Sequence, residues 1–175
     1  MPDRTLVVYY TRTGTTQQLA RWIAAAVDAD LERIVDRSRR GGVLGYLRSS
    51  WEAGMQRTVR IEPPVRDPTR YSLVVIGTPI WMDNVASPVR SYLEAHRNEL
   101  DRVAFFCTCG RAGERRTFEQ MAELCGTTPV ATLSVRASAI EDCGLGVATF
   151  AEKIALRTPG APPPFVVGPD TSELQ

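Results

Sequence analysis

Short apolar runs recur along the chain and alternate with stretches whose apolar positions are spaced three or four residues apart. The runs "TLVVYY", "SLVVIG" and "RVAFFC" contain few polar residues, which is typical of parallel strands with both faces buried. Two further runs of similar length complete the pattern. We therefore expect five strands, over residues 5–10, 31–35, 72–77, 102–107 and 129–135.

The stretches between these strands have the periodicity of amphipathic helices. In the first of them, Leu19, Ile23 and Ala26 fall on one face. In the second, Ser87 is placed to cap the helix, and Pro88 suits the first helical position. The predicted helices span residues 15–27, 87–97, 114–126 and 146–157.

Strands that alternate with helices predict an α/β fold, a doubly wound parallel sheet with helices on both faces. We expect one folded domain over residues 1–157, followed by a proline-rich tail over 158–175. Residues 39–57, between the second and third strands, carry an apolar stripe at helical spacing. This segment is either the crossover helix of the βαβ unit or a lid or dimer surface that carries Tyr46 and Trp51.

Composition narrows the class of protein. The chain has 175 residues and a formal net charge of +1, so charge provides no general attraction to nucleic acid or to anionic membrane. We expect no integral membrane segment and no signal peptide, because no apolar run is long enough to span a bilayer. Four cysteines without the spacing of a disulfide framework fit a reducing compartment, and we expect a cytoplasmic protein. A single histidine, with no CxxC or HExxH motif, predicts no metal site.

The residues between the first strand and the first helix, "TRTGTT" over 11–16, are small and rich in hydroxyl groups. A helix N-terminus leaves backbone N–H groups unpaired and carries roughly half a positive charge, so it binds phosphate readily. Gly14 lets the backbone approach a ligand closely, and Arg12 can add a charged contact. The glycines and the lysine of a Walker loop or a dinucleotide fingerprint are missing. The segment predicts either a small anion site or a threonine-capped turn.

The order [S/T]-x-T-G-x-T directly after a first strand resembles the phosphate loop of the flavodoxin family, which holds the phosphate of FMN. The stretches "VVIGTPIW" (74–81) and "FFCTCGRAG" (105–113) resemble the two flavin-contacting loops of that family. They end the third and fourth predicted strands. The resemblance covers about residues 5–157 and implies a 2-1-3-4-5 strand order, with FMN bound at the switch-point crevice.

The resemblance implies three groups of FMN-binding residues. The first loop would bind the phosphate, and the second and third loops would flank the two sides of the isoalloxazine ring, with Trp81 stacked on it. The implied residues are Thr11, Arg12, Thr13, Gly14, Thr15 and Thr16 in the first loop, Thr78, Pro79, Ile80 and Trp81 in the second, and Thr108, Cys109, Gly110, Arg111 and Gly113 in the third.

Similar proteins include electron carriers, quinone reductases and a protoporphyrinogen oxidase. The resemblance thus implies a redox protein that passes electrons from NAD(P)H or a reductase to a partner protein or a small acceptor such as a quinone. Arg111, Arg115 and Arg116 lie in or just after the third loop, and positive charge there favours a reduced flavin more than in an acidic carrier. Met82 stands where many flavodoxins have glycine, and we expect it to resist positive φ.

Two other interpretations stay open. Cys109 and Arg115 spell C-x5-R between a strand and a helix, the context of a phosphatase loop in which a thiolate attacks phosphate. A flavodoxin-like module that has lost FMN and only binds partners is the second alternative. Cys107 and Cys109 share one face of a strand, so they are either a vicinal redox pair or small core residues. The sequence does not predict an oligomeric state.

Overall fold

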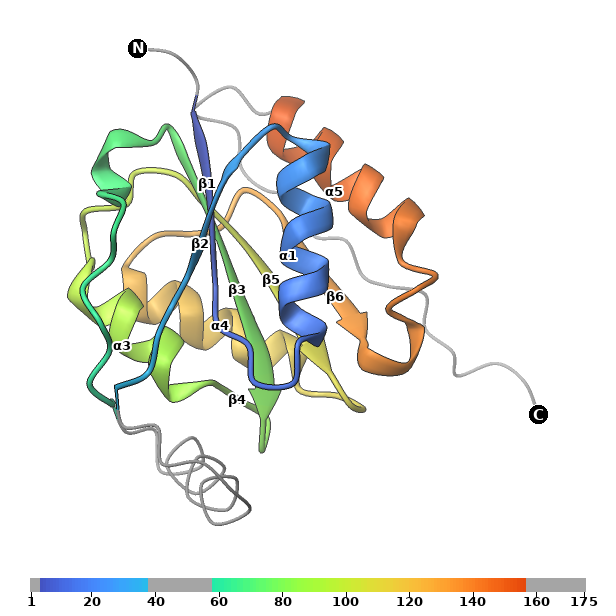
Figure 1. Ribbon diagram of the computed structural model, residues 1–175, viewed down its shortest axis with the longest axis horizontal. Helices are drawn as coiled ribbons and strands as arrows, with labels where there is room; N and C mark the ends of the chain where they lie inside the picture. Colours follow the sequence, from blue (N-terminus) through green and yellow to red (C-terminus); the bar gives the residue numbers. More distant parts are fainter. Residues whose placement is uncertain (1–3, 38–57, 157–175) are drawn as a thin grey trace.

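The computed structural model describes residues 4–37 and 58–156. Within these residues, a parallel sheet of five strands is covered by helices on both faces (Figure 1). The strand order β2-β1-β3-β5-β6 is the predicted 2-1-3-4-5 order once the short antiparallel β4 is left out of the count. The parallel strands are β1 (Thr5–Tyr9), β2 (Asp30–Arg33), β3 (Leu73–Trp81), β5 (Val103–Cys109) and β6 (Thr132–Arg136).

The strand β4 (Asn84–Val85) is not predicted by the sequence pattern. It pairs antiparallel with the end of β3, with Ile80 opposite Val85 and Trp81 opposite Asn84. Consequently β3 runs to Trp81, four residues beyond its predicted end. The last part of β3 is one arm of a hairpin, and this hairpin carries the second predicted flavin loop.

Among the described residues, helices cover both faces of the sheet (Figure 1). Helices α1 (Thr15–Ala26) and α5 (Gly144–Leu156) lie on one face, and α3 (Ser87–Ala95) and α4 (Glu114–Cys125) lie on the other. Short 3-10 turns, η1 (Pro68–Arg70) and η2 (Ala137–Ala139), precede β3 and α5. The helix expected over 39–57 and the tail expected over 158–175 lie outside the described residues.

Alternation along the strands divides the core into two layers. On β1, Val7 and Tyr9 pack against α1 and α5, while Leu6 and Val8 pack on the side of α3 and α4. All four side chains are buried. The nearly continuous apolar pattern of the central strands therefore reflects burial on both faces, as the sequence predicts.

Two local predictions about the helices are wrong. Ser87 is the first residue of α3 rather than its cap, because Ala86 has the extended backbone of an N-cap and the turn contains Pro88. The Ser87 hydroxyl is buried and makes no hydrogen bond within the described part of the chain. Ala26 is exposed, since α1 ends there and the partly buried Val27 packs against the core beyond it.

Asp30, the first residue of β2, joins this strand to Arg4 and Tyr71, which lie just before β1 and β3. Its carboxylate accepts hydrogen bonds from Arg4 Nη2 at 2.6 Å and from the Tyr71 hydroxyl at 2.9 Å. The Arg4 guanidinium also lies over the Tyr71 ring, 5.2 Å from its centroid. The Tyr71 hydrogen bond, followed by the Arg4 hydrogen bond and charge, holds the pKa of Asp30 below its ordinary value, against partial desolvation.

We expect Asp30→Asn to lower the melting temperature at neutral pH and to have little effect in acid. A depressed carboxyl pKa stabilises the fold fully above the ordinary pKa of about 4, and the stabilisation is lost as the pH falls through the lowered value. Melting temperatures of wild type and variant between pH 7 and pH 2 test this. The gap should close on acidification, whereas a substitution of the exposed Asp101 should give no such convergence. A gap that persists unchanged to pH 2 would show that Asp30 acts without its charge.

Candidate functional site

The loop between β1 and α1 has the geometry of an anion site. Gly14 precedes the first turn of α1 with a positive φ of 99°, and its N–H donates to Thr11 Oγ1 at 3.1 Å. Among the described residues no side chain caps α1. A methyl group added to Gly14 would meet no atom within 4 Å, so the space beside the loop is open. The first N–H groups of α1 are therefore left for a ligand.

The threonines of this loop divide into two kinds. Thr13 is exposed and Thr15 is half-buried, and their hydroxyl oxygens lie 3.5 Å apart. Thr11 and Thr16 are almost fully buried, at 3% and 2% exposure. The hydroxyl of Thr16 lies 2.8 Å from that of Thr108 on β5. Thr13 and Thr15 are thus the hydroxyl groups that a phosphate would meet first, while Thr11 and Thr16 shape the loop; Arg12 is exposed beside them.

In the second predicted loop, the β3–β4 hairpin, Pro79 and Ile80 are partly buried, and so is Trp81. The Trp81 ring stands edge-on to Tyr10, with centroids 5.7 Å apart and planes at 86°. Thr78 is fully buried, and its hydroxyl donates to the Pro79 carbonyl at 2.9 Å and accepts from the Ala86 N–H at 3.1 Å. Thr78 therefore holds the base of the hairpin and does not present its side chain to a ligand.

The hairpin turns at Met82 and Asp83, which both have positive φ, 48° and 57°. Two such residues in a two-residue hairpin turn define type I′ geometry. Met82 thus has the positive φ that its side chain disfavours, because the hairpin requires this backbone and neighbouring side chains stabilise it. Asn84 Nδ2 donates to the Met82 carbonyl at 2.6 Å, and Gln120 Nε2 donates to Asn84 Oδ1 at 2.7 Å.

Asn84 and Gln120 are site residues that sequence reasoning missed. Gln120, on α4, also accepts the Val85 N–H on its Oε1 at 3.2 Å, so one amide side chain binds two residues of the hairpin. An asparagine near the end of an apolar run is a turn signal. No sequence signal connects it to a glutamine 36 residues further on.

The third predicted loop follows β5 and contacts the hairpin. Gly113 caps α4 with a φ of 104°, and a methyl group there would lie 2.7 Å from Asp83 Oδ1 and 3.0 Å from Asp83 Cα. Gly113 therefore allows the turn of the hairpin to approach the start of α4. Gly110 and Arg111 are exposed, with open space at Gly110.

The three loops meet at one edge of the sheet, where β1, β3 and β5 end (Figure 1). In the sheet Tyr9 lies opposite Gly77, and Pro79 lies opposite Thr108. The contact between the Thr16 and Thr108 hydroxyls joins the first loop to the third. This edge lies beside the point where the strand order reverses, which is the usual binding site of an open α/β sheet.

Comparison with known proteins agrees with this geometry. A family model described as flavodoxin matches residues 4–134, about three quarters of the chain. The chain belongs to the flavodoxin family. No curated protein matches it, whereas many solved structures do.

Three solved structures illustrate the shared fold. A flavoprotein from Lactobacillus acidophilus NCFM, solved in complex with FMN, is 21% identical with a TM-score of 0.67, and the match covers 80% of this chain and 97% of that one. A candidate flavoprotein from Bacteroides eggerthii is 24% identical with a TM-score of 0.67, covering 83% and 98%. Another from Bacteroides uniformis is 20% identical with a TM-score of 0.71, covering 87% and 99%.

The phosphatase interpretation lacks its geometry in this flavodoxin. Cys109 is 4% exposed, and its sulfur faces β6, 3.8 Å from Ser134 Oγ and 3.9 Å from the Val135 carbonyl. Arg115 instead points to solvent, where its Nε donates to Glu119 at 2.9 Å. The nucleophile and the guanidinium that would clamp its substrate are therefore turned to different neighbours.

The cysteines have the environment of core residues. All four are free and buried, and burial raises the pKa of the Cys107 thiol to about 12. Burial also raises the pKa of Cys125 and of Cys143. Since the thiolate is the reactive form, Cys107, Cys125 and Cys143 are protected from reagents both by burial and by their raised pKa, whereas Cys109 is protected by burial. The structure thus supports small core side chains over a vicinal redox pair.

We expect the folded chain to resist thiol reagents. At pH 8 a thiol with the pKa of Cys107 is thiolate in roughly one molecule in ten thousand. Titration with a chromogenic disulfide should detect almost no reaction over an hour in buffer and four equivalents after unfolding in urea. Rapid reaction of one thiol in the folded chain, located by mass spectrometry at Cys109, would instead support the phosphatase interpretation, in which Cys109 is the nucleophile.

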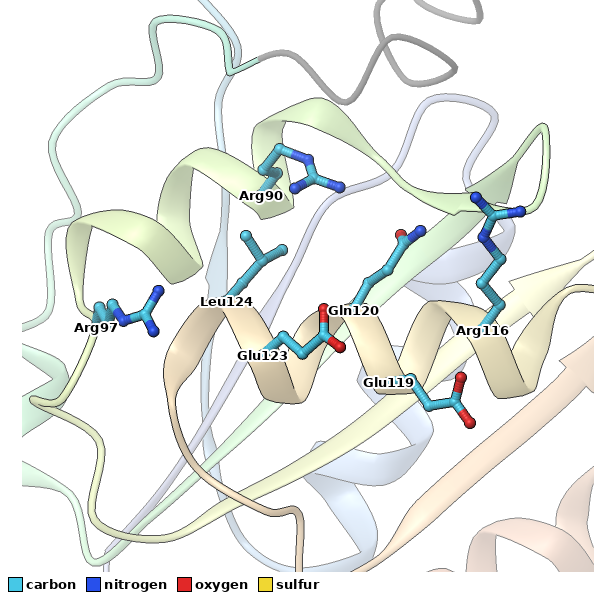
Figure 2. Close-up of a pocket in the computed structure, with 7 residues that line it drawn as sticks. All are labelled: Arg90, Arg97, Arg116, Glu119, Gln120, Glu123 and Leu124. Carbon is cyan, nitrogen blue, oxygen red and sulfur yellow. The ribbon is translucent and has the colours of Figure 1, made fainter.

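The arginines expected beside the flavin are spread over different surfaces. Arg111 is exposed in the third loop, and Arg115 is paired with Glu119. Arg116 lines a groove between α3 and α4 together with Arg90 and Arg97 (Figure 2). The expected raising of the flavin potential therefore depends mainly on Arg111 and remains a prediction.

Residues 4–37 and 58–156 include the helices α1, α3, α4 and α5. None of the helices there combines the length and apolar character needed to cross a membrane. No cluster of three or more histidine, cysteine, aspartate or glutamate residues there is arranged to hold a metal ion.

Proposed function

We propose that this flavodoxin binds FMN and passes electrons from NAD(P)H or a reductase to a partner protein or a small acceptor such as a quinone. The observation that carries the proposal is the meeting of the three loops at the edge where β1, β3 and β5 end. Family membership supports the same cofactor, and one structure of the same fold was solved with FMN. The four unpaired cysteines support a place in the cytoplasm.

The residues of the first loop fit a phosphate. The N–H groups at the start of α1 have no side-chain cap, Gly14 leaves open space beside them, and Thr13 and Thr15 offer hydroxyl donors. The helix dipole adds positive potential at the same point. Arg12, exposed in this loop, can supply a charge-assisted contact.

The other two loops fit the ring. Trp81 has an indole that is still partly exposed, and the backbone around Pro79 and Ile80 is also accessible in part. On the other side, the residues at the end of β5, from Thr108 through Gly113, would face the ring, and Gly113 lets the hairpin turn at Asp83 come close to them. When bound, FMN supplies one-electron and hydride chemistry. The chain binds and orients the ring, and Trp81 shields one face from water.

Reduction of the FMN-loaded chain under anaerobic conditions tests this proposal. The yellow protein should bleach at 450 nm with NADH, NADPH or an added reductase, and a quinone should restore the colour. Direct turnover with NAD(P)H and a quinone would identify an enzyme, and reduction only through a reductase would identify a carrier. A chain that retains no FMN at micromolar concentration contradicts the proposal, whether it is inert or cleaves an aryl phosphate.

A further inference from the structure

A groove between α3 and α4 is lined by three arginines that the proposed FMN site does not use. Arg90 lies on α3, Arg97 follows that helix, and Arg116 lies on α4 (Figure 2). The groove has a volume of about 550 Å³, which is within the range of small-molecule sites. The rest of its lining comes from α4: Glu119, Gln120, Glu123 and Leu124.

Arg90 is the residue that distinguishes this groove from ordinary surface charge. It is only 7% exposed, and its Nε and Nη2 are buried without a hydrogen-bond partner among the described residues. Burial accordingly lowers the pKa of this guanidinium, although the charge of Glu94 offsets part of the effect. A buried charge without a partner is costly, so a counter-charge that enters from the groove would stabilise the protein.

The acidic residues near the groove leave it with an excess of positive charge. Glu119 bonds to Arg115 at 2.9 Å, and Figure 2 shows its carboxylate directed away from Arg90. Glu94 is exposed on α3, one turn beyond Arg90. Glu123 is therefore the carboxylate of the lining that competes most directly with an incoming anion.

We propose that the groove binds a phosphate group, either free or carried by a small molecule. Arg90 provides the inner contact, and Arg97 and Arg116 lie toward the two ends of the groove (Figure 2). A phosphate carries up to two charges and several acceptor oxygens, so it can bind more than one guanidinium, whereas a carboxylate usually satisfies one. Because Arg90 is buried, a compact group within the groove reaches it and a flat protein surface does not.

Calorimetric titration with inorganic phosphate tests the proposal, at an ionic strength held constant with sodium chloride. The titration is made on the full chain and on the Thr13→Val/Thr15→Val chain, in which the phosphate loop of the FMN site is disabled. Binding should persist in both. Arg90→Met should weaken it at least about tenfold, the loss expected for a charge-assisted contact. Glu123→Gln should tighten it about two- to fivefold by removing repulsion.

Stability measurements separate this role from a structural one. Arg90→Met should leave the melting temperature without phosphate unchanged or higher, because it removes a buried and unpaired charge. A structural arginine would give a lower melting temperature. Arg70→Met is the control, since Arg70 is exposed, pairs with Asp67 and does not line the groove, and it should not change phosphate binding.

Titration with ADP distinguishes the two sources of the phosphate group. Binding of ADP about tenfold tighter than inorganic phosphate would identify a phosphorylated small molecule, and equal or weaker binding would identify the free ion. No binding of either up to about 20 mM, or binding that Arg90→Met leaves unchanged, would overturn the proposal. So would binding of a polyglutamate peptide without binding of phosphate, which would indicate a protein partner.

Discussion

Replacing Thr13 and Thr15 together by valine is expected to weaken FMN binding by about 100-fold. Each hydroxyl that bonds to a charged phosphate contributes about 1.5 kcal/mol or more, and two such losses correspond to about two orders of magnitude in affinity. Valine keeps the shape and the β-branching of threonine, so the backbone of the loop should be retained. Quenching of flavin fluorescence during titration of FMN with the protein gives the dissociation constant.

Riboflavin, which lacks the phosphate, is the most informative control for this experiment. The double variant should bind riboflavin as well as the wild type does, because the ring would contact the hairpin and the third loop and not the substituted first loop. Thr149→Val, on the exposed side of α5, is the control for threonine replacement in general. If the double variant binds FMN with wild-type affinity, the first loop is not the phosphate site, and the assignment of all its residues fails.

Gly77→Ala is expected to destabilise the fold by about 3 kcal/mol, at the upper end of the usual effect of overpacking. Gly77 lies opposite Phe106 in the sheet, and the ring of Phe106 covers it. A methyl group at Gly77 would lie 2.0 Å from Phe106 Cζ and 2.3 Å from Cε2, well inside contact distance. Phe106 is fully buried, so its ring has no open space to move into. The midpoint of urea unfolding measures the loss.

A double-mutant cycle identifies the cause. Phe106→Leu removes the ring atoms that would clash, and in that background Gly77→Ala should cost less than about 1 kcal/mol. Gly144→Ala is the control, because Gly144 begins α5 beside open space and should tolerate a methyl group. If Gly77→Ala lowers the free energy of unfolding equally in both backgrounds, the strain lies in the backbone and the clash with Phe106 is not its cause.

The sheet could be predicted from the sequence because its signal is local. Strand, turn and helix each have a spacing of apolar positions that a few neighbouring residues determine, and burial on both faces makes that spacing clear in β1, β3 and β5. The motifs after these strands resemble those of the flavodoxin family, and this resemblance implied the strand order and the three loops at one edge. The helix ends were less certain, because the predicted cap Ser87 became the first residue of its helix.

The contacts within the site could not be predicted in the same way. The bond between Thr16 and Thr108 joins residues 92 positions apart, and it turns a predicted phosphate ligand toward the neighbouring loop. The left-handed backbone of Met82 contradicts a local rule for that residue type, since Asn84 and Gln120 hold the turn from outside it. Local rules fail here because the energy that stabilises the turn comes from another element.

The sequence by itself determined the α/β alternation and the positions of the three loops, since these depend on periodicity and on short motifs. The strand order was implied by the resemblance to the flavodoxin family. Only the tertiary structure decided which polar groups stay accessible at the loops and which bond to each other. It separated the Cys109 thiol from Arg115. It also brought Arg90 on α3, Arg97 just after that helix and Arg116 on α4 to one groove. The physical reason is that burial follows from the spacing of apolar residues along the chain. The partners of polar groups depend instead on how elements distant in sequence pack together.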